Sequence, residues 1–303
     1  MDGWRTRFFM DSARPKSQPA VKLRPGTPND SAVLGRICYE AFAAISNAHN
    51  FPEDIPNVET ATGLISMLLS LPHAYSVVAE IDGKIVGSNF LWEGDVVAGV
   101  GPITVDPEAQ NSNVGKQMML DVIKRAEDRK ALSTRLVQAA YHSRSLSLYT
   151  KLGFDVVEPL ALITGKPSKT SIDGISVRAM TVEDLTFTDE LAINVHGHTR
   201  HNEVAGAIAQ GTAKVAVRGS RITGYTTGIG FFGHTVGETN EDLKALIADA
   251  GEFSGPGFLL PTRNSDVFRW CLQNGLRVIQ PMTLMSKDFY HEPQGAFLPS
   301  ILF

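Results

Sequence analysis

The chain has 303 residues, enough for one large domain or two ordinary ones, and its 43% hydrophobic and 20% charged side chains are typical of a globular protein. A formal net charge of -4, without a Lys/Arg-rich block, argues against nucleic acid or an anionic membrane surface as a partner. No apolar run approaches the roughly 20 residues that span a bilayer, which argues against a membrane protein.

Two features of the chain bear on its compartment. Residues 1–20 lack the apolar core of a secretory signal peptide, and we interpret them as a flexible extension. An organellar presequence is the alternative, and Asp2 and Asp11 argue against it. Cys38 and Cys271 are far apart and both sit in helix-like apolar patterns, so we expect buried free thiols in a reducing, cytoplasmic compartment.

Residues 21–163 predict a mixed α/β domain. Two segments carry apolar residues at helical spacing, two strand-like runs flank an Asp-Gly turn, and a third strand contains glycines and a proline that indicate a bulge or splay. In chain order, the expected elements are a helix around residues 33–45, strands within 75–92 and 95–105, a helix around 114–126, a strand around 134–140 and a short helix that ends at Gly153.

The order of short motifs indicates an internal duplication. Three segments of the first half have counterparts in the second half, in the same order. We therefore predict two tandem domains of one fold, at residues 21–163 and 175–303, joined by a Gly/Pro/Ser/Lys-rich linker at 164–174. The paired segments are LRPGTPNDSAVL with VRAMTVEDLTFT, VAEIDGKIVG with VAVRGSRITG, and LGFDVV with NGLRVI.

The segment TVDPEAQNSNVGKQMM, which starts at Thr104, leads from a strand through a turn into a helix. A helix start presents unpaired backbone N–H groups and about half a positive charge, so it binds phosphate without cationic side chains. We therefore expect residues 110–116 to hold a phosphate or pyrophosphate group, although an ordinary strand–turn–helix corner has the same pattern. The loop is neither a Walker motif nor the G-x-G-x-x-G dinucleotide motif.

QNSNVG at residues 110–115 is followed by LYTKLGF at 148–154. This pair resembles the pyrophosphate loop, Q/R-x-x-G-x-G/A, and the L-Y-x-K-x-G-F run of the GCN5-related N-acetyltransferase (GNAT) family. The likeness covers about residues 21–160, and the whole chain resembles bacterial tandem acetyltransferases with a degenerate second copy. Asn113 replaces the first glycine of the loop, but asparagine enters left-handed backbone conformations readily. We expect the turn to survive, and weaker coenzyme A binding would be the cost.

The resemblance implies that acetyl-CoA is the cofactor. The pantetheine arm would pair with the backbone at residues 103–105, which would also stabilise the oxyanion, and Tyr149 would be the general acid toward the departing thiolate. A core aromatic is the alternative for Tyr149, and a surface or capping role is the alternative for His142 and Ser145. The cofactor-binding residues so implied are Ile103, Thr104, Val105, Gln110, Asn111, Ser112, Asn113, Val114, Gly115, Lys116, His142 and Ser145.

The general base is not assigned to one residue. Glu93 and Asp95 stand at the entrance of the glycine-containing strand, and Glu40 projects from the first helix, but each has a solvated surface role as its alternative. His142 is a further candidate. A water molecule relayed to a backbone carbonyl would leave no signature in the sequence.

The second copy lacks the loop. The corresponding region, FFGHTVGETNEDLKALIADA from Phe231, contains Gly237, while Glu238, Glu241 and Asp242 near its helix start suit helix caps and would repel pyrophosphate. The segment PTRNSDVFRWCLQNGL has no tyrosine at the acid position. We therefore expect this copy not to bind coenzyme A and to wall the substrate site instead.

The densest polar cluster of the chain is NVHGHTRHNEV, from Asn194. His196, His198 and His201 have no carboxylate at matching spacing, so no metal site is predicted. A surface loop, a helix cap and substrate recognition all remain open for this cluster. In the last case Arg200 would bind a carboxylate of the substrate.

The predicted function is transfer of an acetyl group from acetyl-CoA to a small amine, by direct attack on the thioester. One alternative is acetylation of a protein lysine or N-terminus, for which an open groove is expected. Another is a non-catalytic acyl-CoA-binding protein, which Asn113 and the unassigned base favour. A nucleotide-phosphate enzyme is disfavoured because an acidic pair suited to Mg²⁺ is missing. The acceptor is not identified, and a monomer and a homodimer are both compatible with the sequence.

Overall fold

The computed structural model describes residues 20–166 and 169–302, so nearly all of the extension predicted at residues 1–20 lies outside the described residues. The first half contains the predicted elements and one further helix, α2, which starts where Asn57 accepts a hydrogen bond from Thr60 N at 2.8 Å. Its elements are β1 (Val21–Pro25), α1 (Ser31–Ala48), α2 (Val58–Ser70), β2 (Ala74–Ile81), β3 (Lys84–Trp92), β4 (Val97–Val100), β5 (Thr104–Val105), α3 (Val114–Asp128), β6 (Ser133–Ala139), α4 (Ser143–Lys151) and β7 (Asp155–Thr164).

The alternation of side chains along β2 and β3 divides the buried residues of the first half between two faces. Val78 and Phe90 pack in a cluster with α1 and α2, whereas Val77 and Leu91 pack on the opposite face with α3. The apolar face predicted for α3 is buried throughout, and that of α1 is buried or half-buried except for Val33, which is 40% exposed. The prediction that both cysteines are buried free thiols is confirmed.

The second half begins with a corner that repeats the first one. Arg24 donates to Asp30 at 2.8 Å, and Arg178 donates to Asp184 at 2.8 Å, and in both corners the carboxylate also closes a capping box. No described helix is long and apolar enough to cross a bilayer. The elements are β8 (Ser176–Ala179), α5 (Leu185–His196), α6 (His201–Ala209), β9 (Lys214–Arg218), β10 (Arg221–Thr226), β11 (Thr235–Gly237), α7 (Asn240–Asp249), β12 (Phe258–Pro261), α8 (Ser265–Gln273), β13 (Arg277–Asp288) and β14 (Ala296–Leu298).

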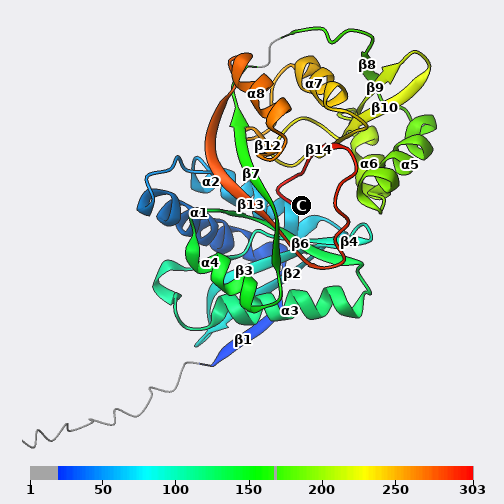
Figure 1. Ribbon diagram of the computed structural model, residues 1–303. Coiled ribbons are helices and arrows are strands. Elements are labelled where there is room, and N and C mark those ends of the chain that lie inside the picture. Colours follow the sequence, from blue (N-terminus) through cyan, green and yellow to red (C-terminus); the bar gives the residue numbers. More distant parts are fainter. Residues whose placement is uncertain (1–19, 167–168, 303) are drawn as a thin grey trace, which may run out of the picture.

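One nine-stranded sheet contains strands from both halves, in the order β1-β2-β3-β4-β6-β13-β7-β12, with β5 also paired to β3. The long strand β13 lies between β6 and β7 and is antiparallel to both, and β12 pairs with the other edge of β7 (Figure 1). A second sheet has the order β14-β11-β10-β9-β8. The linker predicted at residues 164–174 follows β7, yet strands from before and after the linker pair with one another in this sheet. The sequence did not predict that β13 of the second half would insert between β6 and β7 of the first half.

The strand predicted at residues 95–105 is interrupted, as its glycines and proline indicate. Its first part, β4, pairs with β3 and runs parallel to β6, where Val97 is opposite Ser133. Its second part, β5, pairs with β3 alone, through Gly87 opposite Val105. Residues 101–103 lie between the two parts, and the pairing of β4 with β6 ends at Gly99, so the strand is interrupted where its glycines and proline stand.

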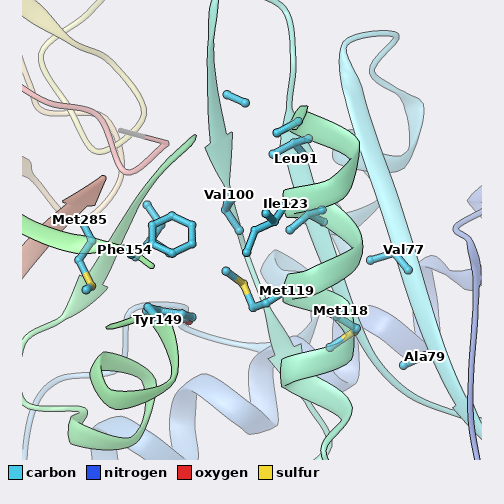
Figure 2. Packing of buried hydrophobic residues seen from close by; sticks show 14 of the residues in the cluster. Val77, Ala79, Leu91, Val100, Met118, Met119, Ile123, Tyr149, Phe154 and Met285 are labelled. Carbon is cyan, nitrogen blue, oxygen red and sulfur yellow. The ribbon is translucent and has the colours of Figure 1, made fainter. Parts of the chain in front are cut away.

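The core of the first half is completed by a residue of the second half. Met285 of β13 is fully buried in the cluster that also holds Met119 of α3, Tyr149 of α4 and Phe154 (Figure 2). The backbone of Met285 lies opposite Leu136 of β6. The first half therefore needs β13 both for the hydrogen bonds of β6 and for the packing of its own core.

Truncation of Met285 tests this dependence. We expect Met285→Ala to lower the free energy of unfolding by about 2–5 kcal/mol, because it removes a fully buried side chain from a shared core. Met67→Ala on α2 is the matched control, because Met67 is 45% exposed and its truncation should change stability by no more than about 0.5 kcal/mol. Urea unfolding measures both, and equal small losses would show that β13 is not needed by this core.

Candidate active site

A cavity of about 650 Å³ lies beside the splay between β4 and β5. On the side of the first half it is lined by parts of α1 and α2 with their connecting loop, by residues 101–103, and by β6 and α4. The second half adds Phe231, Phe232, Met282 and Ile301, which are all apolar. The second half is expected to wall the substrate site, and it does wall this cavity.

A glycine in β4 allows the chain after β14 to pack directly on the sheet. A Cβ atom at position 99 would lie 2.0 Å from the backbone oxygen of Leu302, far inside van der Waals contact, so Gly99 tolerates no side chain while Leu302 stays in place. Leu302 lines the cavity, and the neighbouring Ile301 N donates to Phe231 O at 2.8 Å. This segment therefore closes one side of the cavity through backbone contacts.

The predicted phosphate loop adopts the backbone expected of it. Asn113 has φ 66°, in the left-handed region, and immediately precedes the first residue of α3. Asn111 is also left-handed, with φ 69°, and the Ser112 hydroxyl donates to Ala109 O. The Asn113 side chain makes no capping hydrogen bond, so the N–H groups of the first turn of α3 are left without a side-chain cap. The prediction that asparagine can replace the loop glycine is thus confirmed for the backbone.

Arg144 is a residue of this loop region that the sequence analysis missed. From the first turn of α4 it donates to Gln110 Oε1 and to Asn111 Oδ1, each at 2.9 Å. These two bonds fix the side chains that begin the loop and place a guanidinium group beside it. The only sequence signal was its position between His142 and Ser145, which is not specific for such a role.

His142 and Ser145 line the cavity and contact each other. Ser145 Oγ lies 2.6 Å from His142 Nδ1 and 3.3 Å from Gln138 Oε1. Burial, together with the charge of Arg144 and the nearby His49, lowers the pKa of His142 below its usual value of 6.5, so the imidazole is neutral at neutral pH. The amide Nε2 of Gln138 is buried and has no hydrogen-bond partner among the described residues.

Tyr149 lies both in the core and at the cavity. It is 7% exposed, its ring packs edge-on against Phe154 with centroids 6.3 Å apart (Figure 2), and it is among the residues that line the cavity. Burial raises the pKa of its phenol above the usual value of 10, so the hydroxyl stays protonated at neutral pH. Tyr149 is therefore a core aromatic that also reaches the cavity, and its role as general acid stays a prediction.

Among the described residues, the backbone of β5 is hydrogen-bonded to a neighbouring strand along one edge only. Ile103 lines the cavity, while Thr104 and Val105 form β5 and pair with β3. In the part of the chain that the structure describes, no strand pairs with the other edge of β5. That edge lies at the splay, where an extended ligand could add as a strand.

The carboxylates considered as bases have other partners. Glu93 accepts from Arg125 at 2.8 Å, and Glu40 accepts from Arg36. Asp95 accepts from the backbone N–H of Asn202 at 2.9 Å and so caps α6 of the second half. The carboxyl that lines the cavity is instead that of Asp54, in the loop between α1 and α2, together with its neighbour Glu53. The sequence analysis missed both.

The helix start in the region predicted to be the second copy is already capped. Thr239 N donates to Asp242 Oδ2 at 2.9 Å, and the same carboxylate accepts from Thr223 at 2.6 Å and from Arg218 at 3.1 Å. Asp242 is fully buried. A carboxylate thus already caps the start of α7 and adds negative charge there. That this region does not bind coenzyme A stays a prediction.

The polar cluster from Asn194 lies away from the large cavity. His196, His198 and Arg200 line a second, small cavity, where Arg200 pairs with Glu203. His201 is separate and lies 2.6 Å from Asp189. Within residues 20–166 and 169–302, no group of three or more His, Cys, Asp or Glu side chains could hold a metal ion. The structure does not bring Arg200 to the large cavity.

A family model matches part of the chain. Residues 40–154 match the Acetyltransferase (GNAT) family, and this segment contains the loop at 110–116 and Tyr149. No curated protein matches the chain. Proteins of this family use acetyl-CoA, which is therefore the cofactor that the family match assigns to this segment.

Two solved structures resemble almost the whole chain. A protein of Pyrococcus horikoshii described as an acetyltransferase has 15% sequence identity and a TM-score of 0.66, with 91% of each chain covered. A GCN5-related N-acetyltransferase from Sphaerobacter thermophilus has 16% identity and a TM-score of 0.59, with 90% of this chain and 96% of that chain covered. At these identities the likeness shows the fold alone. The predicted mixed α/β fold is confirmed, whereas the duplication stays a prediction.

The buried histidines predict acid sensitivity. Burial, with the charge of Arg135, lowers the pKa of His198 to about 4. In the unfolded chain the same side chain binds a proton at about pH 6.5, whereas in the folded chain it stays neutral until the pH falls toward 4. The contribution of His198 to stability is therefore complete above about pH 6.5 and is lost as the pH falls toward 4. We expect His198→Gln to flatten the pH dependence of unfolding in that window by about 1.4 kcal/mol per pH unit. Urea unfolding at several pH values measures it, and an unchanged slope would contradict the assignment.

Proposed function

We propose that the protein is an acetyl-CoA-dependent N-acetyltransferase that transfers the acetyl group to a small amine by direct attack on the thioester. The family match at residues 40–154 supports acetyl transfer. The observation that carries the proposal is the cavity in which the splay at residues 101–103, Tyr149 and the apolar walls of the second half meet. A site roofed in this way suits a small molecule better than a protein segment, which needs an open groove.

The residues present fit acetyl-CoA. The uncapped first turn of α3 offers backbone N–H groups to the pyrophosphate, and Arg144 places a positive charge beside them. The unpaired edge of β5 offers backbone groups to the pantetheine arm, and the buried Gln138 amide at the cavity has a donor to spare. When bound, acetyl-CoA supplies the activated acetyl group.

The remaining chemistry is assigned to the residues of the chain. Backbone N–H groups near residues 103–105 stabilise the negative charge that develops on the carbonyl oxygen. With acetyl-CoA bound, the neutral amine would form its bond to the carbonyl carbon and the bond to sulfur would break. The Tyr149 hydroxyl would give its proton to the sulfur. The amine nitrogen would give up one proton to water, and Tyr149 would regain one from water. The raised pKa of Tyr149 keeps its hydroxyl protonated at neutral pH, which is the state that a general acid needs at the start of the reaction.

Substitutions at Gly115 test the cofactor site. A Cβ atom there would lie 3.7 Å from Val105 and 3.8 Å from Leu148, which is ordinary contact, so Gly115→Ala should bind acetyl-CoA as the wild type does. Gly115→Glu places a carboxylate at the helix start, where it suits the helix dipole but repels pyrophosphate.

We expect acetyl-CoA at a hundredfold excess over Kd to stabilise the wild type and Gly115→Ala by roughly 2.7 kcal/mol, and Gly115→Glu by much less. Thermal unfolding with and without acetyl-CoA measures all three. Equal stabilisation of the glutamate variant would place the cofactor elsewhere, and no stabilisation of the wild type would reject the proposed function.

Removal of the Tyr149 hydroxyl tests the general acid. Tyr149→Phe should lower kcat by about 10²-fold, since proton donation by a positioned side chain contributes about 10²–10⁴-fold, while stabilisation by acetyl-CoA is retained. Tyr39→Phe is the matched control, because that hydroxyl donates to Glu53 at 3.3 Å and Tyr39 does not line the cavity. Release of free thiol with a panel of amines is the measurement. Equal turnover of both variants would remove Tyr149 from the mechanism.

A further inference from the structure

The walls of the large cavity carry negative charge and no compensating positive charge. Among the described residues that line it, Glu53 and Asp54 are the acidic side chains, and there is no lysine or arginine. His142 is neutral at neutral pH, because burial lowers its pKa. The other walls are largely apolar, with Phe42, Ile45 and Phe231 among them. A ligand that fits such a cavity is apolar over most of its surface and positively charged at one point.

Asp54 is the acidic group of the cavity whose position is fixed. Gln280 Nε2 donates to Asp54 Oδ1 at 2.7 Å, and the Tyr141 hydroxyl donates to Gln280 Oε1 at 3.0 Å, so the two bonds together set the orientation of the amide. Gln280 is fully buried on β13, and Tyr141 is stacked on Phe51 with ring centroids 4.1 Å apart. The Asp54 carboxyl is therefore held by the Gln280 amide, whose own position is fixed by burial and by the hydrogen bond from Tyr141.

The Asp54 carboxyl is poorly compensated in this position. Burial raises its pKa, and the hydrogen bond from Gln280 offsets that rise only in part. No described lysine or arginine forms an ion pair with Asp54, and its second oxygen is free of hydrogen bonds from the described residues. A half-buried carboxylate without an ion-pair partner gains more from a bound cation than a fully solvated one does.

Glu53 differs from Asp54 although it is adjacent. It is exposed, and it accepts hydrogen bonds from Tyr39 at 3.3 Å and from Asn47 at 3.2 Å. Because water and these partners already solvate its charge, a ligand ammonium would gain little from it. The two neighbours therefore form a matched pair that differs in burial and in partners.

We propose that Asp54 binds the ammonium group of the acceptor, which gives up a proton to water before the neutral amine attacks, and that the acceptor is a primary amine carried on an aromatic or branched alkyl body. This inference rests on the proposed function and names its substrate class. Asp54 is then a specificity residue, and Gln280 and Tyr141 are positioning residues that hold its carboxyl at the cavity wall. The second half of the chain takes part in acceptor recognition through Gln280 and through the apolar walls.

The probes are 2-phenylethylamine, which has the charge and the apolar body, 2-phenylethanol, which has the body without the charge, and methylamine, which has the charge without the body. Calorimetric titration of the full chain in the presence of coenzyme A measures their Kd values. For the wild type we expect 2-phenylethylamine to bind on the order of 10- to 100-fold more tightly than either other probe, the range of a hydrogen bond to a buried charge.

The decisive variant is Asp54→Asn. Its side-chain oxygen can still accept from Gln280, so the loop stays fastened while the charge is removed. We expect the preference for 2-phenylethylamine over 2-phenylethanol to disappear in Asp54→Asn and to persist in Glu53→Gln. A preference retained in Asp54→Asn overturns the proposal. So does a wild type that binds the amine and the alcohol equally, or binds neither at millimolar concentration, and this result needs no variant to fold.

Stabilisation by acetyl-CoA, measured on the same proteins, separates this inference from the proposed function. If acetyl-CoA stabilises the wild type and the amine preference is absent, the amine site is rejected and the proposed function stands. If the amine preference depends on Asp54 and acetyl-CoA does not stabilise the protein, the amine site stands and acetyl transfer is rejected. Asp54→Asn should keep its response to acetyl-CoA, because the phosphate loop and Arg144 are untouched by the change.

Discussion

β13 is hydrogen-bonded along both edges, to β6 on one side and to β7 on the other, and the rest of the structure depends on this double pairing. Buried backbone N–H and C=O groups must be paired, so neither β6 nor β7 could keep its place in the sheet without a partner at that position. The same strand brings Met285 to the core of the first half and Gln280 and Met282 to the cavity or its border. The sequence predicts a boundary at residues 164–174, and the two halves on either side of it share one sheet and one core cluster.

The cavity follows from this arrangement. The side to which we assign the cofactor is built by the first half alone, from residues 101–103, β6 and the helix α4. The side to which we assign the acceptor is built by both halves, because Phe231, Met282 and Ile301 line it and Gln280 donates to Asp54. Under the proposed function, the cofactor and the acceptor are therefore assigned to different parts of the chain that share one sheet.

Features of the site that arise from local backbone chemistry could be predicted from the sequence. The left-handed turn at Asn113 follows from the residue type, and the face of α3 follows from its 3.6-residue period. Both lie in the motif that the family match covers. The splay in residues 95–105 could likewise be predicted, since glycine and proline break a strand locally.

The features that were missed depend on contacts between distant residues. An apolar strand pattern fits any partner of the right register, so the place of β13 between β6 and β7 left no mark in the sequence. Arg144 and Asp54 carry no periodic signal, because one is exposed on a short helix and the other is in a loop. The segment of α2 does have an apolar pattern, so a helix could have been predicted there. The pattern does not indicate that this helix lies beside the cavity.

The insertion of β13 between β6 and β7 also determines when the protein can fold during its synthesis. Ser133 of β6 and Ser286 of β13 lie 2.9 Å apart although 153 positions separate them in the chain. A ribosome that adds about 5–20 residues each second needs on the order of ten seconds to make that stretch. Throughout that time the first half is an unfinished sheet with open strand edges at β6 and β7. Synthesis speed over the second half thus sets how long an aggregation-prone nascent chain must be kept apart from its neighbours.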